Sequence, residues 1–175
     1  MKKLLLISIL FFTACFEESL ESKCKKNDNE ACFQQYKNYY YDKQYDKAMQ
    51  MLEIACNNNH LKSCHNIGVY AYNDNVYPRD FLRAIKHFQK SCDLGDVNDC
   101  KFIAKLHYDF IKLNKNNFNI ALKYSIKLCD LNEYEYCLMA AKLNYSTNKD
   151  KANIYAQKAC DAKLQEACKM LETIK

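Results

Sequence analysis

Ten of the eleven cysteines in this chain form five pairs with one spacing, and this spacing constrains the fold more than any other feature. The two members of a pair lie eight positions apart, as in the segment "CDLGDVNDC" at 92–100. The pairs are Cys24/Cys32, Cys56/Cys64, Cys92/Cys100, Cys129/Cys137 and Cys160/Cys168. Zinc sites place cysteines about two to four residues apart and redox motifs put about two residues between them, so neither template fits.

An offset of eight residues suits the end of one helix, a turn, and the start of an antiparallel helix. The two thiols then face each other across the turn, where their Cα atoms come within the roughly 4.4–6.8 Å that a disulfide requires. The alternative is ten buried thiols in a cytosolic protein, since cysteine packs as a small apolar side chain. The regular spacing favours five disulfides.

The first residues, MKKLLLISILFFTAC, have the order of a secretory signal peptide. Two lysines precede an apolar stretch over 4–12, which is too short to span a bilayer of about 30 Å as a helix. Small residues directly before Cys15 resemble the bacterial lipoprotein signal, in which that cysteine is lipidated and becomes the mature N-terminus. We expect a signal peptide at 1–14, lipidation of Cys15 and a tether at 15–23, with plain secretion and an unpaired thiol as the alternative.

Export would place the chain in an oxidising compartment, where disulfides persist. Phe16 stands where an aspartate is associated with retention in the inner membrane, so the resemblance implies an outer-membrane lipoprotein, with a periplasmic or secreted protein as the alternative. The formal net charge is +5, and about +3 once the two lysines of the signal are subtracted. Lysines and acids are interspersed, which indicates a solvated surface and not a nucleic-acid interface.

The second cysteine of each pair marks a repeat with a period of 31 to 37 residues. Eight residues after it stands a tyrosine in four successive units: Tyr40, Tyr72, Tyr108 and Tyr145. Eight residues before the next pair stands an alanine each time: Ala48, Ala84, Ala121 and Ala152. The variation in period lies between these two positions, where we expect a loop.

Each unit has the pattern of two helices. Four residues after Cys64 share one helical face: Ile67, Gly68, Ala71 and Tyr72. Asp80 is expected to cap the second helix, and Ala84 is small because the two helices approach closely there. Two glycines and one proline in the whole chain argue against a β-rich fold. A period of this length predicts an α-solenoid, in which each hairpin buries its apolar face by stacking on the next.

We therefore predict an all-α, right-handed α-solenoid of four disulfide-clamped helical hairpins plus a C-terminal capping helix. The solenoid covers 24–172. Its units are 31–60, 61–97, 98–132 and 133–163, with a capping half-unit at 164–174. Each cysteine pair joins the second helix of one unit to the first helix of the next, and one such small loop constrains the unfolded chain by roughly 2.5 kcal/mol.

The segments "CDLGDVNDC", "SCHNIGVYAY" and "RDFLRAIKHFQKSC" resemble Sel-like repeat proteins, relatives of the tetratricopeptide repeat. With its paired cysteines the chain is similar to their disulfide-rich branch, the Helicobacter cysteine-rich protein family. The resemblance covers 24–172 and implies an adaptor whose first helices line a concave surface. One departure is Tyr36, where later units have Gly68 and Ala104. Another is that "NDNVYPRD" and "KLNKNN" replace the family's glycine-rich loop, so its loop contacts are not carried over.

The expected binding face is the side of each first helix that the core does not use. Its candidate residues are Gln34, Lys37, Tyr41, Asn66, Tyr70, Phe102, Lys105, Asp109 and Lys142. Lysine recurs at one position in three of these helices, and a lysine row can hold carboxylates or a peptide backbone; an ordinary solvated face is the alternative. The expected partner is a peptide or protein in the envelope or outside the cell, or a peptidoglycan-like or β-lactam small molecule. No nucleic acid is expected, and the membrane is contacted only through the lipid anchor.

The cysteine-rich family also implies a second function, penicillin binding with hydrolysis of β-lactams. A serine β-lactamase often carries its nucleophile in S-x-x-K, and the chain has two matches, Ser22 to Lys25 and Ser146 to Lys149. No S-D-N or K-T-G accompanies them. The four histidines, His60, His65, His87 and His107, lack the spacing of zinc ligands, so neither a metal nor a cofactor is expected. The catalytic residues stay unassigned, and a third interpretation is an envelope structural protein whose tyrosines only pack.

Overall fold

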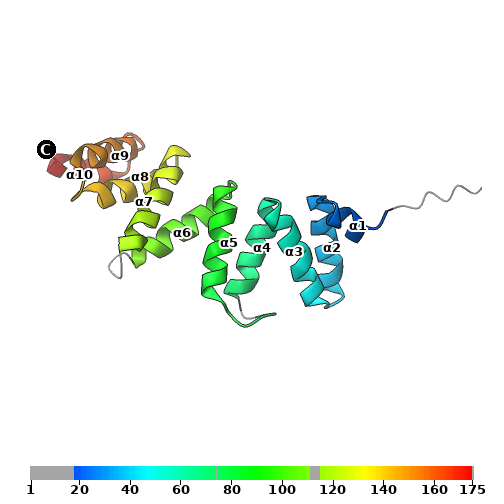
Figure 1. Ribbon diagram of the computed structural model, residues 1–175. Helices are drawn as coiled ribbons and strands as arrows, with labels where there is room; N and C mark the ends of the chain where they lie inside the picture. Colours follow the sequence, from blue (N-terminus) through cyan, green and yellow to red (C-terminus); the bar gives the residue numbers. More distant parts are fainter. Residues whose placement is uncertain (1–17, 74, 111–114, 175) are drawn as a thin grey trace, which may run out of the picture.

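A computed structural model gives the structure of the chain and describes residues 18–73, 75–110 and 115–174. The expected signal peptide and Cys15 lie outside the described residues. Ten helices form the regular structure of the described part: α1 (Leu20–Lys25), α2 (Asn29–Tyr41), α3 (Tyr45–Asn57), α4 (Leu61–Tyr72), α5 (Phe81–Asp93), α6 (Val97–Asp109), α7 (Lys115–Asp130), α8 (Tyr134–Asn144), α9 (Lys149–Asp161) and α10 (Gln165–Ile174). They follow one another along an elongated row, with α1 and α10 at opposite ends (Figure 1).

Four helical hairpins form this row: α2 with α3, α4 with α5, α6 with α7, and α8 with α9. Each hairpin packs on the next, and α10 packs on α9 at the end of the stack. The buried side chains form successive clusters along the row, without one central core. The predicted all-α solenoid is confirmed.

Small residues allow the two helices of a hairpin to approach closely. The four alanines of the repeat are all 0–3% exposed: Ala48, Ala84, Ala121 and Ala152. In the second hairpin, a Cβ atom added to Gly68 would lie 2.7 Å from the ring of Phe88. Asp80 caps α5 as expected, because its carboxylate accepts a hydrogen bond from the Arg83 N–H at 3.0 Å.

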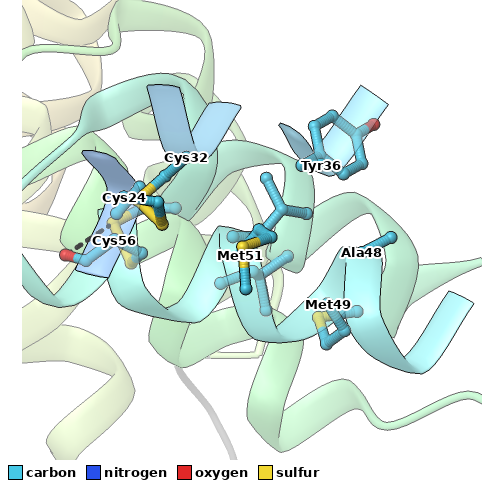
Figure 2. Packing of buried hydrophobic residues seen from close by; sticks show 11 residues of the cluster. Cys24, Cys32, Tyr36, Ala48, Met49, Met51 and Cys56 are labelled. Carbon is cyan, nitrogen blue, oxygen red and sulfur yellow. Dashed lines mark hydrogen bonds between the residues drawn. A yellow bond between two sulfur atoms is a disulfide. The ribbon is translucent and has the colours of Figure 1, made fainter. Parts of the chain in front are cut away.

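The five predicted disulfides are confirmed, with Cα atoms 4.5–4.8 Å apart: Cys24–Cys32, Cys56–Cys64, Cys92–Cys100, Cys129–Cys137 and Cys160–Cys168. Three of them join the end of one hairpin to the beginning of the next, the first joins α1 to α2, and the last joins α9 to α10. Figure 2 shows the Cys24–Cys32 bridge beside Cys56 and Met51 in the first buried cluster. Five disulfides in one chain of this size indicate an oxidising compartment.

The first four bridges are buried inside the stack, whereas Cys160 and Cys168 of the last bridge are only partly buried. Cys137, in the first turn of α8, is fully buried and is bonded to Cys129 at the end of α7. Its Sγ atom lies 3.7 Å from the Cys129 carbonyl oxygen. Four other cysteines are equally inaccessible: Cys24, Cys32, Cys64 and Cys92. These residues are therefore structural joints, and they belong to the core and not to a binding surface.

The turn inside each cysteine pair has one backbone conformation that recurs at every junction. The third residue after the first cysteine has a positive φ angle: Asn27 (68°), Asn59 (63°), Gly95 (115°), Asn132 (65°) and Lys163 (68°). In "CDLGDVNDC" the Gly95 N–H donates to the Cys92 carbonyl at 2.9 Å, and the Asp96 N–H donates to the Ser91 carbonyl at 3.0 Å. These bonds close the end of the helix, and glycine and asparagine adopt the left-handed conformation most readily.

The segment 15–23, expected to be a tether, is partly helical, since α1 begins at Leu20. Ser19 caps α1 by accepting a hydrogen bond from the Ser22 N–H at 3.2 Å. The Tyr39 hydroxyl donates to the Glu21 carboxylate at 2.7 Å, which fastens α1 to α2 together with the first disulfide. The described part of this segment therefore belongs to the stack.

Ion pairs also connect successive units. Between second helices they are Glu53–Arg83 at 2.7 Å, Asp93–Lys123 at 3.4 Å and Asp130–Lys158 at 3.1 Å. Along the first helices and α10 they are Lys101–Glu133 at 2.7 Å, where Glu133 immediately precedes α8, and Lys142–Glu166 at 2.6 Å. Exposed pairs contribute about 0–1 kcal/mol each, so packing and disulfides dominate the stability of the stack.

Candidate binding site

An apolar pocket lies between the second and third hairpins, and we call it the edge pocket. Its cavity volume is about 480 Å³. It is lined by Tyr72, Phe81, Ile85, Phe102, Leu106, His107, Phe110 and Asn117. These residues come from the end of α4, the start of α5, the second half of α6 and the first turn of α7. The pocket therefore lies at the edge where the helices of a hairpin are connected, opposite the disulfides.

The connections at this edge differ in length between hairpins. They are short in the first and fourth hairpins, 42–44 and 145–148, and longer in the second, 73–80. In the first hairpin Tyr45 packs on Tyr40, with ring centroids 5.5 Å apart. The equivalent residues of the second hairpin, Phe81 and Tyr72, are 51% and 39% exposed. Tyr72, expected on the buried helical face, is instead a wall of the pocket, because the longer connection leaves its ring partly uncovered.

The pocket walls are aromatic rings in edge-to-face contact. The centroid of Tyr72 lies 5.7 Å from that of Phe81 and 5.5 Å from that of Phe102. Phe102 also packs on the buried ring of Phe88 at 5.1 Å, so this wall is anchored in the core. Phe110 is 48% exposed. Partly exposed aromatic side chains around a cavity are typical of a binding surface.

His107 also lines the pocket and is 9% exposed. Its Nδ1 atom lies 2.8 Å from Oδ1 of Asn117, and the Asn117 amide donates to the Phe110 carbonyl at 2.7 Å. Its Nε2 atom is buried and has no hydrogen-bond partner among the described residues. The spacing of the histidines in the sequence did not indicate that His107 would line a pocket. Its hydrogen-bond partner Asn117 lies where the repeats differ in length, so the repeat pattern does not pair the two residues.

The residues expected on the binding face do not form one continuous surface. Phe102 lines the edge pocket. Five others are exposed: Gln34, Tyr41, Lys105, Asp109 and Lys142. The remaining three are partly buried: Lys37, Asn66 and Tyr70. Tyr70 contributes to packing between units, because its hydroxyl lies 2.7 Å from that of Tyr36, and burial raises the pKa of Tyr70 well above its ordinary value.

The three lysines of the expected row also differ in their surroundings. Lys37 Nζ lies 4.9 Å from the ring centroid of Phe33, and Lys142 Nζ lies 2.6 Å from Glu166. Lys105 is exposed and has no ion-pair partner in the described part of the chain. Of the row, Lys105 therefore has the ammonium group most available to a ligand.

Neither S-x-x-K match brings its serine and lysine together. The Ser22 hydroxyl donates to the Glu18 carboxylate, and Lys25 pairs with Glu21 at 3.0 Å. Ser146 is exposed in the turn before α9, and Lys149 Nζ lies 5.9 Å from the ring centroid of Tyr145. The contacts of the described residues give the β-lactamase interpretation no support.

One histidine lies in a group with metal-ligand chemistry. The ligand atoms of His65, Asp96 and Asp99 are within 4.8 Å of one another. His65 Nδ1 lies 3.0 Å from both oxygens of Asp99, and Asp96 accepts from the Asp99 N–H at 3.0 Å. Burial raises the pKa of the Asp99 carboxyl. These bonds connect α4 to α6, and the carboxylates come from the next unit, which histidine spacing alone does not reveal.

A family model of the Sel1 repeat matches residues 39–60, 61–96 and 136–164. The chain contains Sel1 repeats. Such repeats typically form scaffolds for protein–protein interaction. The matched segment 61–96 of this Sel1-repeat protein contributes Tyr72, Phe81 and Ile85 to the edge pocket. No helix in the described ranges has both the length and the apolar character needed to cross a membrane.

Two solved structures are similar to this chain. The Sel1 repeat protein from Oxalobacter formigenes has the same fold and is 16% identical with a TM-score of 0.51, over 89% of this chain and 66% of that chain. The protective antigen c5321 of uropathogenic Escherichia coli strains, which displays an SLR fold, is 13% identical with a TM-score of 0.49, over 87% of this chain and 34% of that chain. This Sel1-repeat protein thus spans 66% and 34% of their lengths. No curated protein matches the chain.

Proposed function

We propose that this Sel1-repeat protein is an exported scaffold that holds a protein or peptide partner at the edge pocket. The observation that carries the proposal is an apolar cavity of about 480 Å³ whose aromatic walls are partly exposed. Ligand sites in proteins have volumes of about 300–1,000 Å³ and are mostly apolar, with a few polar groups. Because Sel1 repeats typically form scaffolds for protein–protein interaction, a protein or peptide ligand is favoured over the peptidoglycan-like or β-lactam small molecule that the sequence also left open.

The location of the scaffold is a second part of the proposal. The signal peptide at 1–14 would direct export, and Cys15 would carry the lipid anchor at an outer membrane. Five disulfides support an oxidising compartment. Metabolic labelling with a fatty acid tests the anchor: we expect label in the wild type and none in a Cys15→Ser variant. Unlabelled wild-type protein released into the medium would contradict the anchor.

Selection of displayed peptides against the oxidised mature protein tests the binding function. We expect enriched peptides to lose at least about tenfold in affinity for a Leu106→Glu variant, because a charge in the apolar pocket opposes the burial of an apolar side chain. The matched control is Ile154→Glu, which places the same charge at a residue of α9 that is 55% exposed and does not line the pocket. Peptides that bind Leu106→Glu as tightly as the wild type would refute a role for the edge pocket.

A further inference from the structure

The hydrogen bonds around His107 determine what its unpaired nitrogen can do. The Asn117 amide nitrogen donates to the Phe110 carbonyl, so the Asn117 oxygen is the atom that faces His107 Nδ1. An amide oxygen only accepts, and Nδ1 must therefore carry the proton. In the neutral ring Nε2 is then an acceptor. Buried acceptors without a donor are rare in folded proteins, so an unpaired Nε2 of a residue that is nine-tenths buried and lines a cavity points to a donor on a ligand.

The walls of the edge pocket select for an aromatic ligand. The ring of Tyr72 already contacts those of Phe81 and Phe102 edge to face, at 5.7 and 5.5 Å. Aromatic pairs prefer edge-to-face or offset contacts at these distances, so one further ring continues the same arrangement. Tryptophan, through its indole N–H, and tyrosine, through its hydroxyl, combine a large aromatic ring with a hydrogen-bond donor.

The surroundings of the pocket favour a peptide over a free aromatic molecule. Lys105 is adjacent to the pocket residue Leu106 in α6, is exposed, and has no ion-pair partner among the described residues. Leu82, which follows the pocket residue Phe81 in α5, is an apolar side chain that is 82% exposed. A peptide with an acidic residue near its aromatic residue would satisfy the pocket and Lys105 together.

We infer that the edge pocket binds the tryptophan or tyrosine side chain of a peptide that carries an acidic residue within a few positions of it, and that His107 determines specificity by accepting a hydrogen bond from that side chain. The inference rests on the proposed function and specifies its ligand. Phe102 and Tyr72 contact the aromatic ring, and Lys105 pairs with the acidic residue.

Fluorescence titration tests this inference directly, because the chain contains no tryptophan and the signal comes from the peptide alone. The probes are acetylated Glu-Ala-Trp-Ala-Glu, the same peptide with N1-methyltryptophan, its glutamine-flanked version, and N-acetyltryptophanamide. We expect the wild-type protein to bind the tryptophan peptide about fivefold more tightly than the N1-methyl peptide, in which a methyl group replaces the donated hydrogen. His107→Phe, which keeps a ring and removes the acceptor, should abolish that difference.

The outcomes separate this inference from the proposed function. Equal affinity of the wild type for both tryptophan peptides, with binding still lost in Leu106→Glu, would overturn the role of His107 and leave the proposed function standing. Binding of N-acetyltryptophanamide as tight as that of the peptide, or no effect of the glutamine flanks, would overturn the acidic peptide as the ligand. No binding of any probe would overturn the inference, and peptides selected by display would then test the proposed function independently.

Discussion

At the scale of the residue, the left-handed position inside each cysteine pair is the most sharply defined requirement of this chain. Asparagine occupies it at three junctions, and Gly95 occupies it in the middle of the stack, with a φ angle of 115°. An added Cβ atom at Gly95 would meet no heavy atom within 4 Å, so a substitution there changes backbone strain and not packing. The effect of a substitution at Gly95 on stability therefore measures the cost of the left-handed backbone conformation, without a contribution from steric clashes.

We therefore predict that Gly95→Ala lowers the free energy of unfolding by about 1–2 kcal/mol, because an L-residue is strained at a positive φ. Gly95→Asn should lose less, since asparagine is the residue found at the equivalent place in three other junctions. Urea unfolding of the oxidised protein measures both variants. Alanine tolerated as well as asparagine would show that the turn does not require the left-handed conformation.

The imidazole of His87 makes stability depend on pH. Burial, together with the positive charges of Arg83, Lys86 and Lys90, lowers its pKa to about 4, and its Nδ1 lies 3.7 Å from Cys56 Sγ. An unfolded histidine titrates near about 6.5, so between pH 6.5 and 4 the unfolded chain takes up a proton that the folded protein does not. The free energy of unfolding is therefore not reduced by His87 above about pH 6.5, and it decreases as the pH falls from about 6.5 to about 4.

We expect the wild type to lose about 1–2 kcal/mol more than His87→Gln between pH 7 and pH 4.5, because glutamine does not titrate. Urea unfolding at a series of pH values measures this difference, and other titrating groups cancel in the comparison. If the stabilities of the two proteins changed with pH in parallel, the lowered pKa of the partly buried His87 would be contradicted.

At the scale of the element, helix pairs were predictable because each unit repeats a cysteine, a tyrosine and an alanine at constant offsets. The buried alanines and the Asp80 cap are local consequences of that pattern. The edge pocket was not predictable, because the exposure of Tyr72 and Phe81 depends on how their connection separates two helices in space. The sequence did carry one signal, the extra residues between tyrosine and alanine in the second and third units.

The disulfide between α5 and α6 should matter more than the one between α9 and α10, although the two loops are equal in length. Each bridge constrains the unfolded chain by roughly 2.5 kcal/mol, but the first lies in the middle of the stack and the second fastens only its last helix. We predict that a Cys92→Ala, Cys100→Ala variant unfolds in two separated calorimetric transitions. A Cys160→Ala, Cys168→Ala variant should keep one main transition.

Two transitions in the terminal variant, or one in the central variant, would contradict this nearest-neighbour description of the stack. Alanine is a suitable replacement in both pairs. The four cysteines are buried or partly buried, and an alanine side chain adds no polar group that would need a hydrogen-bond partner there.

At the scale of the whole molecule, the chain is a row of hairpins in which each unit contacts its neighbours. Such a row has a small core for its length, so the covalent joints at the junctions supply a large share of its stability. One edge of the row carries these joints, and the other edge carries connections of variable length with the edge pocket among them. The edge that is cross-linked by disulfides thus holds the hairpins in place, while the connections at the other edge differ between units. This arrangement suits a binding scaffold.

Peptide mapping of the unreduced mature protein by mass spectrometry tests the central claim most directly. The account predicts five linked peptide pairs, each joining cysteines eight positions apart, and no alkylation of the ten solenoid cysteines before reduction. Alkylation of those thiols in native material, or links between cysteines of different pairs, would contradict a stack of hairpins clamped at every junction.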